Sequence, residues 1–456
     1  MTDPEVPAVA EVRAERFPRQ TLLRRAAAVG LSLSGAAALA RSGAAAVPAN
    51  VSKLLSGVTT INFLKGPWVA NEPAFVQKTI QPFYKKFPNI KVQEVEYQWS
   101  TRVVDLTKAF ASPSVPDVTY FSAMYWVRFA ALGALQPLDT LIKDPDFQPV
   151  WNTIPPKLQK SGTYKGHVYA IPFVTDLGSA HMVNLDLLKK AGVKDWSSSL
   201  EAVRAAAKAV KQKTGAWGFG MEATFADGSW QNIMAFIQNA GASVYNSDLT
   251  QAGLNTPNVV KTFDLLRDMW VVDKSAPGPG LYNSQGLDGL WRAGKLAIYN
   301  VYSPQPPELQ GVKFKFDVLP VPGIFPHKYG SYLDIGHLAM SAKSQHQAEA
   351  WDFIKYESTP QGLYPWEKAL GFFYPGARSN SAGLFNTKNA FQRVYKKAYN
   401  DIVLKYAQPS PAEPHLAAVS QVISDQFQAM ASGSQTAAQT TKNMQDQINT
   451  ILKQPV

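Results

Sequence analysis

The sequence predicts an α/β protein made of two lobes of similar construction. The chain has 456 residues, which is more than a single hydrophobic core normally supports. Apolar residues make up 46% of the chain and charged residues 17%, a composition typical of well-packed globular domains. In both halves, segments with strand periodicity alternate with segments of helical periodicity. This alternation predicts lobes in which helices flank a mainly parallel sheet.

The first lobe opens with three predicted strands and the helices that follow them. Residues 89–97 alternate apolar and polar side chains, which is the pattern of a half-buried strand. Residues 72–87 place Phe75, Ile80 and Phe83 at near-helical spacing and predict one amphipathic helix. The same two patterns predict strands at 58–64 and 117–122, and helices at 101–111 and 126–135.

The rest of the chain continues the alternation. Residues 199–215 form a strong helical pattern that Gly215 ends. Residues 167–173 are an apolar run and predict a buried strand. In this strand Pro172, which has no N–H group, is expected to mark the point where the chain leaves one sheet for the next. Further helices are predicted at 258–272, 345–358, 415–433 and 434–453, and further strands at 295–302, 314–322 and 337–342.

Residues 1–46 predict an export signal. A basic stretch precedes a weakly apolar run at 26–40, and small residues at 44–46 form an A-x-A-type cleavage site. The run is too short and too rich in small residues to span a bilayer, although an amphipathic structural helix is an alternative interpretation. The segment PRQTLLR resembles a twin-arginine signal in which Gln20 replaces the second arginine, so the twin-arginine and general export routes both stay open. We expect a periplasmic, soluble product.

The absence of cysteine and the spread of charge exclude several classes of protein. Without cysteine, the chain has no disulfide framework, zinc–thiolate site or cysteine nucleophile. It also lacks the lipid-modified cysteine that anchors many exported bacterial proteins. The net charge is +11; residues 1–46 hold six Arg and four acidic residues, a net of +2, which leaves +9 on the mature chain. The basic residues are scattered, which favours a solvated basic surface over a nucleic-acid site.

Four segments, taken in order, resemble family 1 extracellular solute-binding proteins of ABC importers. Residues 112–142 contain a Pro-Asp-Val strand, a polar loop and a G-x-L-x-P-L-D run, and residues 164–193 resemble the first crossover of that family. Residues 290–303 resemble the segment in which Gly-Lys precedes a strand ending at the site, and residues 332–362 resemble the return crossover and its helix. Each motif alone is loose, but their order and spacing are specific, and the match covers nearly all of 58–456.

The resemblance implies a type II periplasmic-binding-protein fold, similar to maltose-binding proteins of the carbohydrate uptake cluster. Its lobes would be joined by crossover hinge strands and would close on a ligand. The N-lobe is expected to comprise 57–172 plus 331–376, and the C-lobe 173–330 plus 377–456.

The crossover segment holds His167, Asp176 and His181, which raises the question of a catalytic or metal site. The two histidines are fourteen positions apart with a proline between them, and neither has a second ligand at i,i+3 or i,i+4. We therefore interpret His167 as a surface turn residue and His181 as a strand residue. Asp176 follows the strand where the family often places an acidic ligand contact, although a structural hinge hydrogen bond is the alternative.

A sugar site needs flat aromatic rings for C–H faces and polar groups for hydroxyls. In open α/β sheets such groups lie beyond the carboxyl ends of strands. Besides Asp176, the residues that fit these positions, each of which also suits a packing or loop role, are Trp68, Glu72, Gln98, Trp99, Ser122, Tyr125, Trp230, Asn300, Tyr302, Tyr332, Asp334, Phe373, Tyr374 and Arg378.

The function that the resemblance implies is capture of a sugar or oligosaccharide and its delivery to the permease subunits of an ABC transporter. We expect a monomer without a cofactor or metal. We also expect no ATP hydrolysis and no enzymatic activity, because the chain has no G-x-x-x-x-G-K-[ST], G-x-S-x-G or H-E-x-x-H motif. The basic mature chain and Arg378 keep glycerol 3-phosphate, a glycerophosphodiester or a polyol open as alternative ligands. A secreted carbohydrate-active enzyme, which needs paired carboxylates, is a minor alternative.

Overall fold

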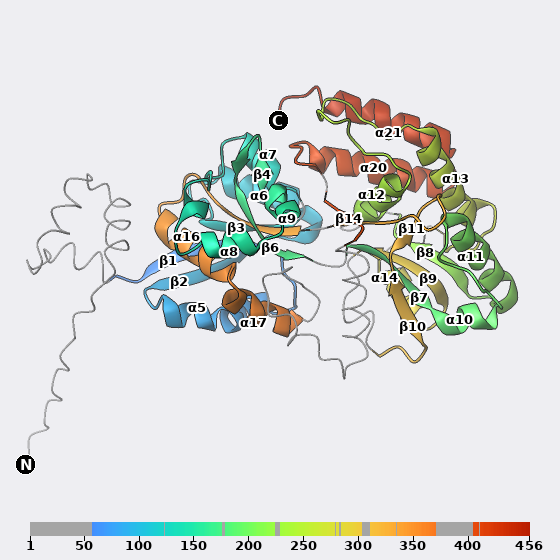
Figure 1. The fold of residues 1–456 in the computed structure, drawn as a ribbon, viewed down its shortest axis with the longest axis horizontal. Helices are drawn as coiled ribbons and strands as arrows, with labels where there is room; N and C mark the ends of the chain where they lie inside the picture. The colour runs from blue at the N-terminus through green and yellow to red at the C-terminus, as the bar shows by residue number, and fades with distance from the viewer. Residues whose placement is uncertain are drawn as a thin grey trace, which may run out of the picture.

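The computed structural model describes residues 57–456 except 123, 176–177, 224–228, 279, 282–283, 303–310, 334, 371–404 and 410. Within these residues the chain forms two halves, each built on its own sheet, which lie side by side in Figure 1. The predicted export signal at 1–46 lies outside the described residues. Among the helices that are described, none combines the length and apolar character needed to cross a membrane.

The first half is built on a five-stranded sheet. The strand order is β2 (Ile90–Glu96), β1 (Thr59–Lys65), β3 (Val118–Phe121), β13 (Ile335–Met340) and β6 (Ala170–Thr175). The helices of this half are α4 (Glu72–Thr79), α5 (Gln81–Lys86), α6 (Arg102–Ala111), α7 (Trp126–Ala131), α8 (Gln148–Thr153), α9 (Pro156–Ser161), α16 (Gln347–Glu357) and α17 (Pro360–Leu370).

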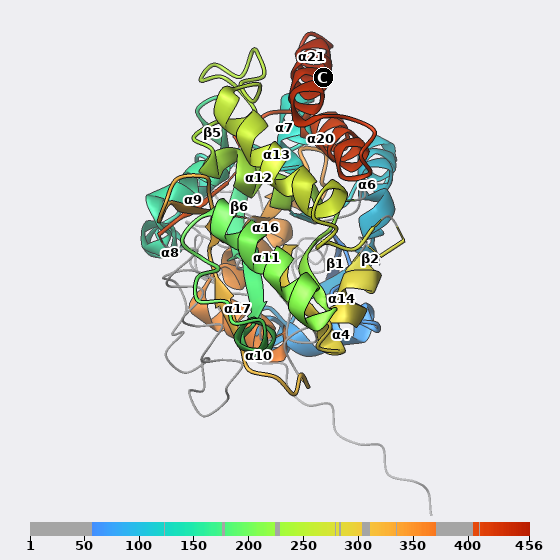
Figure 2. The same ribbon diagram turned by 90° about the vertical axis from the view of Figure 1, so that its right-hand side faces the viewer.

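The second half is built on a four-stranded sheet. The strand order is β10 (Phe316–Leu319), β7 (Ser179–Asn184), β9 (Leu296–Tyr302) and β8 (Trp217–Met221). Figure 2 faces this half and shows α11 crossing in front, with α20 and α21 at the top. The helices of this half are α10 (Leu185–Lys190), α11 (Leu200–Thr214), α12 (Ser229–Asn239), α13 (Pro257–Val271), α14 (Ser284–Arg292), α20 (Leu416–Ala431) and α21 (Ala437–Ile451).

Crossing segments connect the two halves. The chain leaves the first sheet after β6 and enters the second sheet with β7, and it returns between β12 (Tyr329–Tyr332) and β13. β12 belongs to a third sheet, in which β11 (Val321–Pro322) pairs antiparallel and β14 (Ala407–Gln408) pairs parallel with it. Figure 1 shows β14 between the two halves.

The α/β class and the two halves are confirmed, but the sheets are mixed and not mainly parallel. β1 runs parallel to β2 and β3, and β8 runs parallel to β9. The antiparallel pairs involve β6, β7, β10 and β13, most of which carry the chain across or back between the halves. A strand that returns from the other half enters the sheet in the opposite direction, which the local strand–helix alternation does not reveal.

Turn and cap chemistry explains where several helices begin and end. The Ser199 side chain accepts the Ala202 N–H at the start of α11, and Gly215 ends this helix with a φ of 73°, in the left-handed region that favours glycine. The single helix predicted at 72–87 is instead two helices, α4 and α5. Pro82 lies in the first turn of α5. Because proline has no N–H group, it cannot continue the hydrogen-bond ladder of α4, and a new helix begins there.

Pro172 lies inside β6 and not at its end, which corrects the sequence expectation. It pairs with His337, and the register of the two strands shifts between Gly336 and His337. A proline is tolerated at such an irregularity because the regular ladder of the two strands is interrupted there. The first sheet therefore extends to Thr175 before the chain crosses.

Gly178 makes a close approach between the two crossing segments. Its φ is 61°, and a Cβ atom built on it would lie 1.8 Å from the carbonyl oxygen of Tyr332. Beside it, the Ser331 hydroxyl donates to the Ser179 carbonyl at 2.7 Å. The crossing segments are thus packed backbone against backbone, in a conformation that glycine adopts without strain.

The core of the first half contains a buried carboxyl group on α16. Glu357 is 1% exposed, and its Oε2 accepts the indole N–H of Trp366 at 2.6 Å. Its Oε1 has no hydrogen-bond partner among the described residues. Burial raises the pKa of Glu357 from 4.5 to about 8, while the Trp366 bond opposes the rise.

We expect the free energy of unfolding to fall as the pH rises from about 4.5 to 8, because the unfolded chain then ionises Glu357 while the folded chain keeps it protonated. Glu357→Gln retains an acceptor for Trp366 and cannot ionise. This variant should therefore melt about 2–4 °C above the parent protein at pH 8.5. Thermal unfolding followed by circular dichroism at pH 6.5, 7.5 and 8.5 checks this, and equal pH slopes for the two proteins would contradict it.

Candidate functional site

Several of the predicted site residues lie at or just beyond the carboxyl ends of strands in the two sheets. β1 and β3 are parallel, so their carboxyl ends lie at one edge of the first sheet, where Trp68, Ser122 and Tyr125 follow them. β8 and β9 are parallel in the second sheet. Tyr302 ends β9, and Trp230 lies in the first turn of α12, the helix that follows β8 along the chain.

Trp68 is a half-buried ring held by charged and aromatic neighbours. Its ring lies edge-to-face with Tyr120 at 5.0 Å and with Trp366 at 5.5 Å between ring centroids. The Lys65 Nζ lies 3.9 Å from the centroid of the same ring, close enough for a cation–π interaction. These contacts fix the plane of a ring that stays partly accessible.

Glu72 supports the loop that carries Trp68. Its Oε2 accepts the backbone N–H groups of Trp68 and Val69, both at 2.8 Å, and its Oε1 forms an ion pair with Lys65. The residue is 1% exposed. Both carboxylate oxygens are therefore used within the protein, and the predicted direct contact of Glu72 with a ligand stays a prediction.

Gln98 and Trp99 form the second predicted group in the first half. The Trp99 indole N–H donates to the Pro67 carbonyl at 2.6 Å, and a Cβ atom on Gly66 would lie 2.5 Å from the Trp99 ring. Trp99 is thus packed flat on the loop before Trp68. Gln98 is exposed, and its backbone N–H donates to Asp105 at 3.2 Å.

Ser122 and Tyr125 are connected by Arg102, which the sequence analysis did not select. Arg102 is 5% exposed. Its Nη1 donates to the Ser122 hydroxyl at 2.8 Å, and its guanidinium lies 3.9 Å above the Tyr125 ring. The Tyr125 hydroxyl lies 3.5 Å from the Ser420 hydroxyl on α20, which belongs to the second half.

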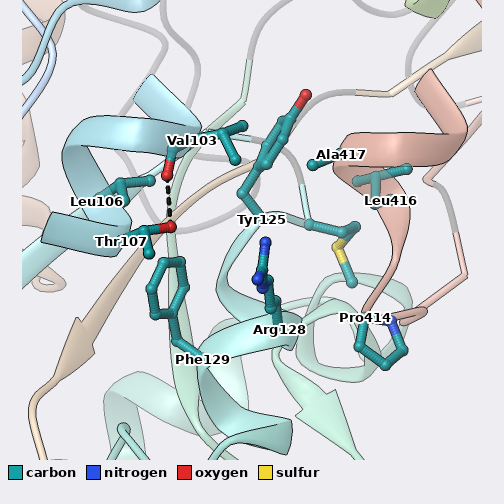
Figure 3. A pocket seen from close by; sticks show the side chains of 10 residues that line it. Val103, Leu106, Thr107, Tyr125, Arg128, Phe129, Pro414, Leu416 and Ala417 are labelled. Carbon is teal, nitrogen blue, oxygen red and sulfur yellow. Dashed lines mark hydrogen bonds between the residues drawn. The ribbon is translucent and has the colours of Figure 1, made fainter. Parts of the chain in front are cut away.

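A small pocket opens beside this contact between the halves (Figure 3). Val103, Leu106, Thr107, Met124, Tyr125, Arg128 and Phe129 line it from the first half, and Pro414, Leu416 and Ala417 from the second. The predicted residue Tyr125 therefore lies at a seam to which both halves contribute.

The second half brings three predicted aromatic residues together. The Trp230 and Tyr332 rings lie 5.2 Å apart and the Tyr302 and Tyr332 rings 6.4 Å apart, measured between centroids. Trp230 is 1% and Tyr332 0% exposed, whereas Tyr302 is half-buried. We call Trp230, Tyr302 and Tyr332 the aromatic trio; it joins the start of α12, the end of β9 and the crossing strand β12.

Asn300 and His181 form a polar pair in the sheet behind the aromatic trio. They face each other across β7 and β9 and are 0% and 2% exposed. Burial lowers the pKa of His181 to about 3, although the nearby Asn300 side chain opposes the shift, so the imidazole is neutral at physiological pH. The Nε2 of His181 and the amide of Asn300 are near each other but lack an aligned hydrogen-bond partner within the described part of the chain.

The remaining predictions from the sequence fall in two groups. Asp176, Asp334, Phe373, Tyr374 and Arg378 lie outside the described residues. His167 is on the surface, where β5 (His167–Val168) pairs with β4 (Thr163–Tyr164), and its Nδ1 lies 3.2 Å from Asp139. Among the described residues, no three His, Asp or Glu side chains come together in a way that would hold a metal ion.

Three buried charged residues near the site were missed by the sequence analysis. Arg102 begins α6 and Lys65 ends β1, and the periodicity of these segments predicts only a helix and a strand. Glu222 comes directly after β8 and is 7% exposed. Their one signal is position: Lys65 ends β1, and Glu222 follows β8, at the carboxyl ends where site residues collect. Nothing in the local pattern predicts that Arg102 turns inward.

Comparison with known proteins matches most of the chain to one family. A family model described as bacterial extracellular solute-binding protein matches residues 67–363. A Brucella abortus protein that is named as a binding protein is 22% identical over 290 residues, 62% of this chain and 68% of its own length. The maltotriose-binding protein of Pyrococcus abyssi is 24% identical over 267 residues, 56% of this chain and 54% of its own length.

A solved structure has the same fold. The ABC transporter solute-binding protein from Thermotoga lettingae, bound with α-D-tagatose, superposes with a TM-score of 0.72 at 21% identity. The match covers 86% of this chain and 100% of that chain. At this identity the likeness shows a shared two-lobed fold.

The burial of the aromatic trio yields a prediction about stability. Trp230→Ala should lower the free energy of unfolding by about 3–5 kcal/mol, because it leaves a cavity under Tyr332. Tyr302→Ala, at a half-buried position, should lower it by less than half as much. Urea unfolding of both variants checks this, and equal losses would mean that Trp230 is not the better packed ring.

Proposed function

Because the chain belongs to the bacterial extracellular solute-binding protein family, we propose that it captures a sugar or oligosaccharide between its two halves. It then delivers the solute, chemically unchanged, to the permease subunits of an ABC importer. We further propose that it is exported and works as a monomer outside the cytoplasm. Relatives that bind sugars support the ligand class: one is named for maltotriose, and a structural neighbour holds tagatose.

The aromatic trio is the observation that carries the proposal. Two tyrosines and a tryptophan meet at the end of β9, beside the crossing segments, and their centroids are 5.2 and 6.4 Å apart. Tyr302 is the half-buried ring of the trio, and the buried rings of Trp230 and Tyr332 pack behind it and hold it in place. A flat ring with a polar edge suits the C–H faces and the hydroxyls of a sugar together. Trp68 offers a fourth ring from the first half, so that a solute between the halves would contact rings on both sides.

The charges near the site favour a neutral solute over a phosphate ester. Binding a phosphate needs cationic side chains that are available to the ligand. Lys65 is paired with Glu72 and lies 4.0 Å from Glu94, so this group holds two acids and one base. Arg102 donates to Ser122 and covers the Tyr125 ring. Both buried cations are therefore engaged within the protein.

Closure would follow from a solute that contacts both halves at once. Such a solute interacts fully only with the closed form and shifts the population toward it. The crossing segments would serve as the hinge, and the contact of Tyr125 with Ser420 would be among those made on closure. The lobe boundaries expected from the sequence, N-lobe 57–172 plus 331–376 and C-lobe 173–330 plus 377–456, remain part of this proposal, except that β6 carries the first half to Thr175.

A thermal-shift series tests the ligand class. Maltose, maltotriose or D-tagatose at about 100 times its dissociation constant should stabilise the protein by about 2.7 kcal/mol, which raises Tm by about 5 °C. sn-Glycerol 3-phosphate and glycerophosphocholine should leave Tm unchanged. Chromatography of the saccharide after incubation should recover it intact. Stabilisation by the phosphates alone would reverse the choice of ligand, and new products would indicate an enzyme.

Substitutions at the partly accessible rings test the site. Trp68→Ala and Tyr302→Ala should each weaken binding of the stabilising saccharide about tenfold, because each removes a ring that stacks on the sugar. His167→Ala, at an exposed position in the same half as Trp68, is the matched control and should bind as the parent does. Calorimetric titration measures all three. A loss for His167→Ala, or none for Tyr302→Ala, would place the site elsewhere.

A further inference from the structure

Three ionisable side chains are buried together behind Trp68. Lys65 ends β1, Glu72 begins α4 and Glu94 lies in β2, the edge strand that pairs with β1. The side chains of Lys65 and Glu94 are 0% and 1% exposed, and Glu72 is 1% exposed. We call these three residues the buried ionic cluster.

Lys65 lies much closer to the Glu72 carboxylate than to the Glu94 carboxylate. It pairs directly with Glu72 and donates to the Gly66 carbonyl at 2.7 Å, whereas the nearest Glu94 oxygen is 4.0 Å away. Neither oxygen of Glu94 has a hydrogen-bond partner among the described residues. One ammonium group thus faces two buried acids, and the second acid is poorly compensated. A buried carboxylate in this position is costly unless it takes up a proton.

The cluster is connected directly to the predicted ligand contact Trp68. Lys65 Nζ lies 3.9 Å from the centre of the Trp68 ring, and Glu72 accepts the N–H groups of Trp68 and Val69 at 2.8 Å each. Any shift of Lys65 from Glu72 toward Glu94 changes both the charge over the ring and the pairing that holds the loop.

We propose that Glu94 is a positioning residue for Trp68: when it binds a proton, Lys65 stays with Glu72 and the Trp68 loop is fixed, and when it loses the proton, Lys65 is drawn toward it and the loop loosens. Solute affinity would therefore be higher in mildly acidic than in alkaline medium. This inference rests on the proposed role of Trp68 in binding a solute.

The electrostatics of the cluster agree with this arrangement. Burial raises the pKa of Glu94 from 4.5 to about 7; the charge of Lys65 opposes the rise, and the charges of Glu72 and Glu96 add to it. Burial lowers the pKa of Lys65, against the influence of Glu72, Glu94 and Glu96. These three charges, from β1, α4 and β2, are the ones that act on Glu94. The proton on Glu94 thus exchanges in the range where an exported protein experiences changes of pH.

Two readouts, one without ligand, test the proposal. The indole N–H resonance of Trp68 in ¹⁵N-tryptophan-labelled protein, assigned with Trp68→Phe, is followed from pH 5.5 to 8.5. Binding of maltotriose and D-tagatose is measured by calorimetry at the two ends of this range. Both are repeated on Glu94→Gln and on Glu96→Gln, the matched control, an exposed glutamate two positions along the same strand.

In the parent protein, the Trp68 resonance should shift with a midpoint near pH 7, and saccharide affinity should fall about threefold to tenfold between pH 5.5 and 8.5. Glu96→Gln should keep both pH dependences, with a somewhat lower midpoint because the charge of Glu96 no longer raises the pKa of Glu94. In Glu94→Gln, the resonance should stay constant and the affinity should remain within about twofold of its acidic value.

Each contrary outcome has a definite meaning. A Trp68 resonance that does not move with pH, or moves equally in Glu94→Gln, overturns the proposal even if the saccharides bind. An affinity whose pH dependence is the same in Glu94→Gln as in the parent also overturns it. If neither saccharide binds at any pH while the resonance shifts as described, the proposed sugar ligand fails and the positioning role of Glu94 stands.

Discussion

The two crossing segments press together at Gly178, where no side chain has room. A Cβ atom at this position would lie 1.8 Å from the Tyr332 carbonyl oxygen, and the φ of 61° favours glycine as well. The adjacent Ser331 hydroxyl binds the Ser179 carbonyl at 2.7 Å. This tight crossing fixes the backbone of Tyr332, and the Tyr332 ring in turn packs on Trp230 and Tyr302. The packing of the crossing segments therefore determines where the aromatic trio lies.

On the opposite side of the seam, buried charges position the aromatic rings. Lys65 and Glu72 hold the Trp68 loop, and Arg102 covers Tyr125 while donating to Ser122. Lys65, Glu72 and Arg102 each have a partner in the protein, which offsets the free energy of desolvation and keeps the rings in place. In the second half, burial keeps His181, which lies in the sheet beside the trio, uncharged. The described rings of the first half thus depend on charged neighbours, whereas the trio packs ring against ring.

The sequence predicted the fold better than it predicted the site. Long periodic segments such as α11 lie where the pattern and its end signals, Ser199 and Gly215, indicate. Local patterns did not predict that β6 and β13 run antiparallel, because strand direction depends on which half the chain returns from. Positions after strands selected Trp68, Tyr302 and Trp230, but periodicity carries no sign of side-chain partners. Position alone therefore selected Glu72 as a ligand contact, whereas its carboxylate forms an ion pair with Lys65. Neither position nor periodicity selected Arg102, which binds Ser122.

The central claim is that a sugar closes the two halves about the crossing segments. The chain has no cysteine, so Lys85→Cys on α5 and Lys190→Cys on α10 place one spin label on each half at exposed positions. The distance between the labels, measured by double electron–electron resonance with and without the saccharide that stabilises the protein, tests the claim directly. We expect saturating saccharide to convert a broad distance distribution into a narrower one at shorter distance. An unchanged distribution in protein that calorimetry shows to be saturated would contradict it.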